Sequence, residues 1–419
     1  MEKRVSETYD VIVIGGGPAG MMAAGRAAEL GARVLLLEKN GSVGKKLLIT
    51  GGGRSNITNN EHNTRKLLEK FRGKGKFLFS AFAQFSVGET LDFFHTRGMP
   101  TILEPEGRIF PKTEKAASVF AVLSTYMKES RVAVRCSAEV SGFQISKNFI
   151  MGVKLKNGEL LSAQSYILST GGTSRPETGS TGDGFRWLSK IGHTVKKPNP
   201  ALVPIRTKEV WAHKLAGLSF KEVKVSTFQN TVLQESHIGK ILFTHVGLSG
   251  PLILNMSNNI GELLNYGKVV LTIDLFPRLD HGALDRNIQA TFQKLQNKKL
   301  KNVLSEIIPA TLARLLPSQL KLDGEKEVNK VSRTERIVLI KFLKAIPLTP
   351  IGVLGLEKAV VVSGGVSLTE VDFRTMRSKK YANLYLIGDI LDIDRPSGGY
   401  SLQLCWTTGW VAGTHTSKP

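Results

Sequence analysis

Three glycines near the amino terminus have the spacing of a phosphate-binding turn. The motif follows the apolar run at 9–14 and consists of Gly15, Gly17, Pro18, Ala19 and Gly20. In a G-x-G-x-x-G turn the first glycine bends the chain, the second lets backbone approach a pyrophosphate, and the third allows close packing of helix and strand. Glu38 ends the next apolar run, 18 residues after Gly20, where a carboxylate accepts hydrogen bonds from ribose hydroxyls. These residues predict a dinucleotide site, with a glycine-rich turn in an unrelated strand–helix–strand unit as the alternative.

A second glycine segment, TGGGRSNITN at 50–59, begins 12 residues after Glu38. Consecutive glycines are costly inside helices and strands, so we expect this backbone to lie against a ligand, with a surface linker as the alternative. In folds that bind FAD, the chain returns here across the pyrophosphate towards the flavin, and Lys46 and Arg54 can offset phosphate charge. The expected contacts in this region are Lys39, Lys46, Gly53, Arg54, Ser55 and Asn56.

Glycines also follow two later apolar runs. The run at 166–170 ends on two glycines, and the cluster at 179–184 then opens a helix, either beside a ligand crevice or as an ordinary capped helix start. The run at 384–387 leads to Asp389, which can hydrogen-bond the ribityl chain or cap a turn. A helix that starts near Gly399 can direct its dipole at the flavin ring and stabilise the anionic reduced flavin. The cofactor contacts expected in these segments and in the preceding meander are Val140, Thr170, Gly171, Gly172, Gly388, Asp389, Gly398, Gly399 and Tyr400.

Candidate acid–base residues are few. His245, in FTHVGLSGP, is the strongest because histidine titrates near neutral pH, and a purely structural histidine is the alternative. Arg54 and Tyr400 are further candidates for positioning a substrate. His193 follows a helical pattern and is expected to cap the carboxyl end of that helix. No cluster of cysteine, histidine and aspartate has the spacing of metal ligands, so no metal is expected.

These side chains require a parallel sheet to position them. The apolar runs at 9–14 and 33–37, with a helical pattern between them, predict an α/β fold with a Rossmann-like FAD-binding domain of the glutathione-reductase-like FAD type. A β-meander is expected from the segments 131–137, 143–146, 149–155 and 159–163, with a hairpin turn at Asn157-Gly158.

Two modules are expected to interrupt this domain. Short alternating segments between 196 and 275 predict a β-barrel-like module, and helical spacing between 280 and 344 predicts a small helical module. The expected domains are 1–194 for the first part of the FAD-binding domain, 195–278 for the β-rich insertion, 279–345 for the helical insertion, 346–356 for the return strand of the β module, and 357–419 for the last part of the FAD-binding domain.

The composition fits a globular chain with a large excess of positive charge. Of 419 residues, 41% are hydrophobic, and 57 Lys and Arg against 35 Asp and Glu give a net charge of +22. The charge is widely spread, which indicates a generally basic surface or, as the alternative, a specific site for a polyanion. Cys136 and Cys405 are too far apart for a CxxC pair. With no apolar run long enough to span a bilayer and no signal-peptide pattern in MEKRVSETYD, we expect a cytoplasmic protein.

Several segments, taken together, resemble one family of bacterial flavoproteins, the group that includes aminoacetone oxidase and the bile-acid dehydro-reductases. They are GKKLLITGGGRSNITN at 44–59, EPEGRIFPKTEKAASV at 104–119, LSTGGTSRPETGSTGDG at 168–184, GKILFTHVGLSGP at 239–251, VVSGGVSLTEVDFRTMRSK at 361–379 and LIGDILDIDRPSGGYSLQ at 386–403. The resemblance implies FAD and a two-part insertion. The chain departs from the family pattern at Ser55, usually Cys, at Asp389, usually Glu, and at Ser401, usually Asn. A mechanism that needs a thiol at position 55 therefore fails for this chain.

The resulting hypothesis is an FAD-dependent oxidoreductase. A small organic substrate would exchange a hydride with flavin N5, and NAD(P)H, oxygen or a quinone would close the cycle. No second G-x-G-x-x-G precedes a helix, so a separate NADPH domain is not expected and NAD(P)H would bind transiently. The alternative is a flavin-containing RNA-binding or RNA-modifying protein, to which the net charge and the shared opening motif point. A fumarate-reductase-like enzyme is a weaker reading, because it rests on TGDG at 181–184 alone.

Overall fold

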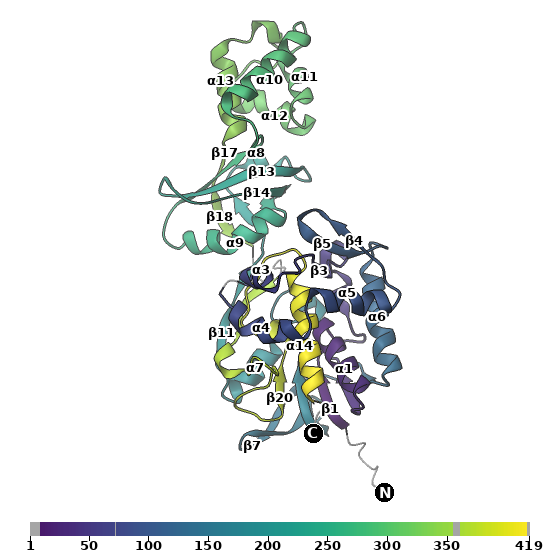
Figure 1. The fold of residues 1–419 in the computed structure, drawn as a ribbon. Coiled ribbons are helices and arrows are strands. Elements are labelled where there is room, and N and C mark those ends of the chain that lie inside the picture. The colour runs from purple at the N-terminus through teal and green to yellow at the C-terminus, as the bar shows by residue number, and fades with distance from the viewer. Residues whose placement is uncertain (1–8, 72, 355–360, 417–419) are drawn as a thin grey trace. The chain divides into compact units, whose positions relative to one another are not determined.

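The computed structural model describes residues 9–71, 73–354 and 361–416. The chain forms two compact units (Figure 1). Unit 1 comprises Met1–Asn199 and Val360–Pro419, and unit 2 comprises Pro200–Ala359. Each unit has its own hydrophobic core. Unit 2 is therefore an insertion in the sequence of unit 1.

A five-stranded parallel sheet in the order β20-β10-β1-β2-β6 forms the centre of unit 1. Its strands are β1 (Tyr9–Ile14), β2 (Val34–Leu37), β6 (Ala133–Arg135), β10 (Ala163–Leu168) and β20 (Leu384–Leu386). The α/β fold class is confirmed, because β1 and β2 flank the helix α1 (Pro18–Glu29) as the glycine motif predicts. The register pairs Ile14 with Leu168, and Leu168 with Leu386. The carboxyl ends of three strands therefore meet at one edge of the sheet.

The segment 131–137 was wrongly assigned to the meander. Its central residues form β6, which pairs in parallel with β2 through Leu36 and Val134. The remaining segments do form an antiparallel sheet, β7-β8-β9, with β7 (Val140–Ser146), β8 (Phe149–Leu155) and β9 (Leu160–Leu161). A three-residue strand gives too short a pattern to distinguish a parallel from an antiparallel partner.

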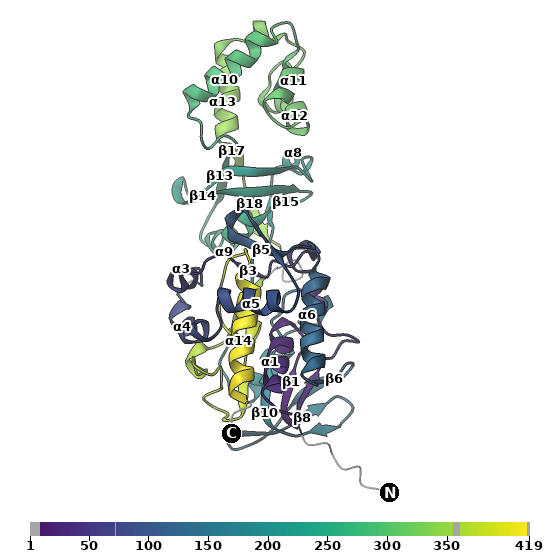
Figure 2. The same ribbon diagram turned by 45° about the vertical axis from the view of Figure 1, so that its right-hand side comes forward.

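Two helices lie side by side on the parallel sheet, α1 and α14 (Tyr400–Thr416), as Figures 1 and 2 show. Glycines allow this close approach: a Cβ on Gly409 would stand 2.6 Å from the Ala19 carbonyl oxygen, and one on Gly413 would stand 2.6 Å from that of Ala23. Because the contacts advance together along both helices, α1 and α14 run in the same direction. Their amino ends consequently point the same way, and that of α14 extends beyond that of α1.

The other elements of unit 1 surround the parallel sheet and the helices α1 and α14. The helices are α2 (Lys45–Leu48), α3 (Thr64–Glu69), α4 (Gly75–Gln84), α5 (Val87–Thr96), α6 (Ala116–Glu129) and α7 (Asp183–Lys190). A small antiparallel sheet contains β3 (Thr58–Asn59), β5 (Arg108–Pro111) and β4 (Thr101–Glu104), and a two-stranded sheet joins β11 (Val195–Ala201) to β19 (Val361–Val366). The chain thus passes between the two units through paired strands.

Unit 2 combines a seven-stranded sheet with helices around one core. The sheet order is β17-β16-β13-β14-β15-β12-β18, and its strands are β12 (Ile205–Thr207), β13 (Ser219–Gln229), β14 (Val232–Thr244), β15 (Gly247–Ser249), β16 (Val269–Asp274), β17 (Ile346–Leu348) and β18 (Pro350–Val353). The helices are α8 (Val210–His213), α9 (Pro251–Leu263), α10 (His281–Lys294), α11 (Leu300–Val303), α12 (Ala310–Leu320) and α13 (Arg333–Lys344). The strands β17 and β18 rejoin the sheet after the helices.

His193 caps the carboxyl end of α7 through its backbone N–H, which donates to the Leu188 carbonyl oxygen at 2.9 Å, and not through its ring. Its side chain is buried, with Nδ1 2.8 Å from Glu370 Oε2 and Nε2 3.0 Å from Ser378 Oγ. Glu370 also accepts a hydrogen bond from the Thr194 backbone N–H and pairs with Lys380 at 2.8 Å. His193 therefore fastens the chain before β11 to the chain after β19.

We expect the free energy of unfolding to fall as pH is lowered from 7 towards 4. Burial lowers the pKa of His193 below its ordinary 6.5, so the unfolded state takes up a proton first and stability is lost below about pH 6.5. Burial acts to raise the pKa of Glu370, but hydrogen bonds from Lys380 and Thr194 bring it to about 2, so its contribution is lost as pH falls below 4.5. Urea unfolding at several pH values should give a shallower dependence between pH 5 and 6.5 for His193→Gln than for the native chain. If the free energy of unfolding changed equally with pH in the two proteins, protonation of His193 would not be the cause.

Candidate functional site

The edge where three parallel strands end is built around Gly15. Its φ is +105°, and its carbonyl oxygen accepts a hydrogen bond of 2.8 Å from Ser169 Oγ at the end of β10. A Cβ on Gly20 would overlap the Gly15 carbonyl oxygen, so only glycine fits there. By contrast, nothing lies within 4 Å of the position of a Cβ on Gly17, which precedes α1. This open space at a helix amino end, with N–H groups of the first turn available, suits a phosphate.

Glu38 is held in place by its neighbours. One carboxylate oxygen accepts a hydrogen bond of 2.8 Å from the Gly16 N–H, and the other accepts bonds of 2.8 and 2.7 Å from the backbone and side chain of Asn40. The Asn40 amide also donates to the Thr178 carbonyl oxygen at 3.0 Å. Sequence reasoning missed Asn40, although its position two residues after Glu38 allows it to bond that carboxylate locally.

The glycine-rich stretch after β10, residues 171–184, packs against the chain around Glu38. Lys39 Nζ lies 2.8 Å from Asp183 Oδ2 and 2.6 Å from Thr181 Oγ1. Gly179 has a φ of +105°, and a Cβ there would stand 2.6 Å from Asn40 Nδ2. The crossover between β10 and α7 therefore packs against 38–40, and the Lys39 charge is paired with Asp183.

The opening glycines of 50–59 adopt a conformation that other residues rarely take. Gly51, Gly52 and Gly53 have φ of +57°, +69° and +86°, within a 3-10 turn at Thr50–Gly53. Nothing lies within 4 Å of a Cβ on Gly52 or Gly53. Ser55 also has a positive φ, +60°, although it is fully buried. Such strain in a non-glycine residue is typical of ligand-binding segments.

Arg54 is bound to two carboxylates. Its guanidinium pairs with Glu104 and Glu114 and lies 4.2 Å from the centroid of the Phe110 ring. The hydrogen bond with Glu104 raises the pKa of Arg54 above its ordinary value. A contact between Arg54 and a phosphate or substrate would therefore compete with these carboxylates, and the role expected for Arg54 stays a prediction.

A second charged cluster surrounds Asp389, which follows β20 (residues 384–386). Asp389 pairs with Arg395 and, at 3.5 Å, with Lys46, and Lys46 Nζ lies 2.5 Å from Ser174 Oγ. Burial acts to raise the pKa of Asp389, but the charges of Arg395 and Lys46 hold it below its usual value. The Arg395 side chain is 1% exposed and also donates to the Ile393 carbonyl oxygen at 2.8 Å and to Ser401 Oγ at 3.1 Å. Arg395 was missed as a site residue, although it stands in the segment 386–403.

The amino end of α14 lies against β3. A Cβ on Gly399, whose φ is +99°, would overlap the Thr58 backbone. Gly398, with a φ of +118°, accepts a hydrogen bond of 3.2 Å from Asn59 Nδ2. Tyr400 starts the helix, its ring packs edge-on against Phe71, and burial raises the pKa of its phenol. The phenol therefore stays protonated at neutral pH.

The residues present fit a flavin dinucleotide. Three buried side-chain oxygens on these segments have no hydrogen-bond partner within the described ranges: Asn56 Oδ1, Thr170 Oγ1 and Thr173 Oγ1. Orphan polar atoms of this kind are rare in folded proteins. Polar groups of a bound dinucleotide would supply the missing partners. Val140 is buried at the start of β7, and its expected contact with the cofactor stays a prediction.

The candidate catalytic residues belong to different units. Arg54 and Tyr400 are in unit 1, whereas His245 is an exposed residue of the turn between β14 and β15 in unit 2. In the part of the chain that the structure describes, no group of three or more His, Cys, Asp or Glu side chains could hold a metal ion. Within the same part, no helix is both long and apolar enough to cross a bilayer.

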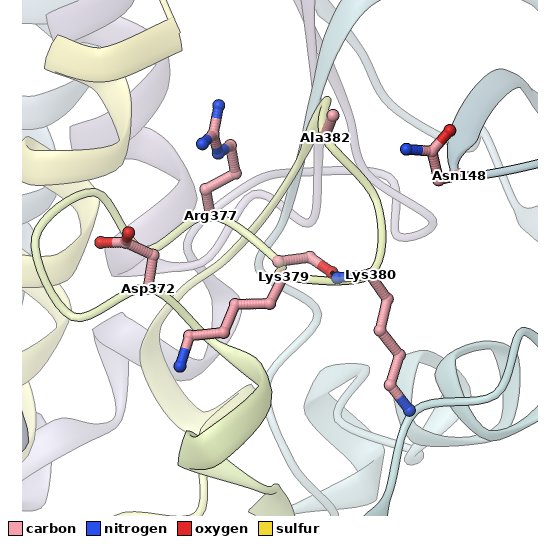
Figure 3. A pocket seen from close by; sticks show the side chains of 7 residues that line it. Asn148, Asp372, Arg377, Lys379, Lys380 and Ala382 are labelled. Atoms are coloured by element: carbon pink, nitrogen blue, oxygen red, sulfur yellow. Dashed lines mark hydrogen bonds between the residues drawn. The ribbon is translucent and has the colours of Figure 1, made fainter.

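Figure 3 shows a surface pocket, whose volume is about 270 Å³. It is lined by Asn148, Asp372, Arg377, Ser378, Lys379, Lys380 and Ala382. These residues come from the β7–β8 turn and from the chain that leads into β20, so they lie near the amino end of that strand. Its lysines are already engaged, because Lys379 donates to the Thr369 carbonyl oxygen and Lys380 pairs with Glu370. The pocket is therefore separate from the glycine-lined site.

Known proteins are similar to this chain over nearly its whole length. The family model described as HI0933-like protein Rossmann domain matches residues 9–415. The 3-dehydro-bile acid delta(4,6)-reductase of Clostridium scindens is 30% identical over 409 residues, which cover 96% of this chain and 97% of that protein. The ribosomal RNA dihydrouridine synthase of Escherichia coli is 29% identical over 410 residues, which cover 97% of each chain. Among solved structures, a 3-ketosteroid delta1-dehydrogenase from Sterolibacterium denitrificans has the same fold, with a TM-score of 0.55 at 14% identity over 98% of this chain and 100% of that one.

Proposed function

Because the chain belongs to the HI0933-like Rossmann-domain family and is an FAD-dependent oxidoreductase, we propose that it reduces an activated carbon–carbon double bond in a small organic substrate, with NAD(P)H as electron donor. The resemblance drawn from the motifs is confirmed by the family match. The observation that carries the proposal is the 30% identity over nearly the whole chain to a delta(4,6)-reductase, together with the orphan polar atoms that a bound FAD would satisfy.

Each part of the crevice has a proposed task. The open backbone at Gly17 and the amino end of α1 would hold the pyrophosphate, and Glu38 would accept hydrogen bonds from the ribose. Lys46 and Asp389 would bind the ribityl and phosphate region, with Arg395 keeping Asp389 ionised. FAD, when bound, supplies hydride transfer at N5. We also propose that FAD is contacted by Lys39, Ser55, Asn56, Gly171 and Gly172.

The reduction needs one hydride and one proton. The hydride adds to one carbon of the double bond and the proton to the other, while NAD(P)H gives up the hydride that restores the reduced cofactor. Tyr400 is the proposed proton donor, because its buried phenol keeps its proton at neutral pH and stands at the amino end of α14. His245 is the alternative proton donor, and Arg54 is proposed to position the substrate. Activity measured after substitution of each residue by alanine or phenylalanine separates these roles.

Purified protein is expected to be yellow and to release FAD on denaturation. Anaerobic NADH or NADPH should bleach the flavin, and a conjugated enone such as a 3-oxo-Δ4,6 steroid should restore its colour faster than buffer alone. Fumarate, a quinone and oxygen are the comparison acceptors. A colourless protein that takes up no FAD would refute the assigned cofactor, and an FAD-loaded protein that no enone reoxidises would refute the proposed substrate class.

A second candidate function is the modification of RNA. It is favoured by the net charge of +22 and by the nearly full-length similarity to a ribosomal RNA dihydrouridine synthase. Conversion of uridine to dihydrouridine also adds two hydrogens across a double bond, so the same flavin site would serve both substrates. This function predicts that ribosomal RNA transcripts reoxidise the flavin and bind with a steep dependence on salt, whereas the enone has no effect.

A further inference from the structure

The chain that follows the glycine segment is fastened to α14 residue by residue. Trp406 Nε1 donates to the Ile57 carbonyl oxygen at 2.9 Å, and Thr58 Oγ1 donates to Gln403 Oε1 at 2.6 Å. Asn59 Nδ2 donates to the Gly398 carbonyl oxygen at 3.2 Å. Three consecutive residues, 57–59, therefore each make a polar contact with α14 or with the turn that precedes it.

Gln403 is the central contact of this series. It is fully buried, and every hydrogen-bonding group of its amide has a partner. The oxygen accepts from Thr58, and the nitrogen donates to Thr90 Oγ1 at 2.9 Å and to Thr407 Oγ1 at 3.1 Å. These hydroxyls of Thr90 and Thr407 donate in turn to backbone carbonyl oxygens at 2.8 Å. The amide thus joins β3, α5 and α14.

The direction of these hydrogen bonds makes the position specific for glutamine. The hydrogens of the Thr90 and Thr407 hydroxyls are committed to backbone carbonyls, so each hydroxyl faces Gln403 as an acceptor. A glutamate carboxylate would place an acceptor against them, and leucine would leave the Thr58 hydroxyl without its partner. A fully satisfied buried network of this kind fixes one relative arrangement of its elements.

We propose that Gln403 is a positioning residue of the flavin site, which sets the separation between the glycine segment 51–56 and the amino end of α14. The inference rests on the proposed FAD contacts of both segments. Gln403 is buried one turn after Tyr400, so it acts through Thr58 rather than by touching a ligand. When this link is lost, the helix amino end moves relative to the flavin and stabilises the anionic reduced form less well. The flavin then binds more weakly and becomes harder to reduce.

The test compares Gln403→Leu with Val411→Ala, a variant of a fully buried residue two turns further along the same helix. The measurements are the FAD dissociation constant of the apo-protein, the flavin midpoint potential and the melting temperature. We expect Gln403→Leu to raise the dissociation constant at least tenfold and to make the potential more negative. Val411→Ala should lower the melting temperature by a similar amount and change the dissociation constant less than twofold.

Two further variants separate the loss of the hydrogen bonds from a general loss of stability. Thr58→Val removes only the hydroxyl that bonds Gln403, so it should fold and shift affinity and potential in the same direction by a smaller amount. Gln403→Glu should behave like Gln403→Leu, because its carboxylate cannot donate to Thr90 or Thr407. Flavin affinity and potential equal to those of Val411→Ala in both Gln403→Leu and Thr58→Val would overturn the inference. A native chain that binds no FAD would instead overturn the proposed function.

Discussion

Replacing Gly53 with valine is expected to remove most of the bound FAD from a protein that still folds. Gly53 has a φ of +86°, so a β-branched residue is strained there by about 1–3 kcal/mol. The valine side chain would also project into space where no atom lies within 4 Å of its Cβ apart from the adjoining residues. If the flavin occupies that space, the added methyl groups collide with the flavin and leave the protein core unchanged.

Gly158 provides a matched control for the backbone strain. It has a φ of +90°, nothing lies within 4 Å of its Cβ position, and it stands in the exposed turn between β8 and β9. Gly158→Val should therefore cost similar stability and leave the flavin-to-protein absorbance ratio unchanged. Arg54→Ala should reduce the ratio less than Gly53→Val, because it adds no bulk. Equal flavin content in the Gly53→Val and Gly158→Val proteins would show that the glycine segment does not touch the cofactor.

Replacing Arg395 with methionine is expected to lower the free energy of unfolding by about 3–5 kcal/mol, because the change leaves a charge without its buried partner. The guanidinium of Arg395 is almost completely buried and is the close partner of Asp389. Without it, Asp389 keeps only the longer 3.5 Å contact with Lys46. The FAD content should fall as well, since Asp389 is a proposed contact of the cofactor.

A second substitution tests this explanation. Asp389→Asn removes the charge that Arg395→Met leaves with only the longer Lys46 contact, so the double variant Asp389→Asn/Arg395→Met should be more stable than Arg395→Met alone. Urea unfolding of the apo-proteins provides the four free energies of the cycle. Additive effects of the two substitutions would mean that the pair is not coupled and that Arg395 contributes through packing alone.

Patterns between residues close in sequence were sufficient to predict the first strands and the first helix of unit 1. The strand β1, the glycine turn and the helix α1 are contiguous in sequence, so periodicity and spacing determine them. The antiparallel strands β7 and β8 have an alternating pattern and are joined by a short turn. These signals also lie close together in the sequence. β6 was misplaced because its parallel partner β2 lies about a hundred residues earlier and its own pattern spans only three residues.

The partners of the site residues could not be predicted in the same way. Arg54 is bound by Glu104, 50 positions later, and Thr58 by Gln403, 345 positions later. No local pattern announces such pairs, because they depend on which elements the fold brings together. Backbone conformation was easier to predict, since consecutive glycines are needed where φ is positive at three successive residues. The glycines thus indicated the backbone conformation of 51–53, but no pattern indicated that Arg54 is paired with Glu104 and Glu114.

The pairing of β11 with β19 has an evolutionary consequence. These two strands carry the chain out of unit 1 and back into it, and they are neighbours in one small sheet. Where these two strands pair, the outgoing and the returning chain are therefore about one strand spacing, 4.8 Å, apart. A recombination event that exchanges the coding sequence between them would replace the whole insertion and leave every strand of the parallel sheet intact. Such an architecture lets a lineage acquire a new inserted module while it inherits the nucleotide-binding frame unchanged.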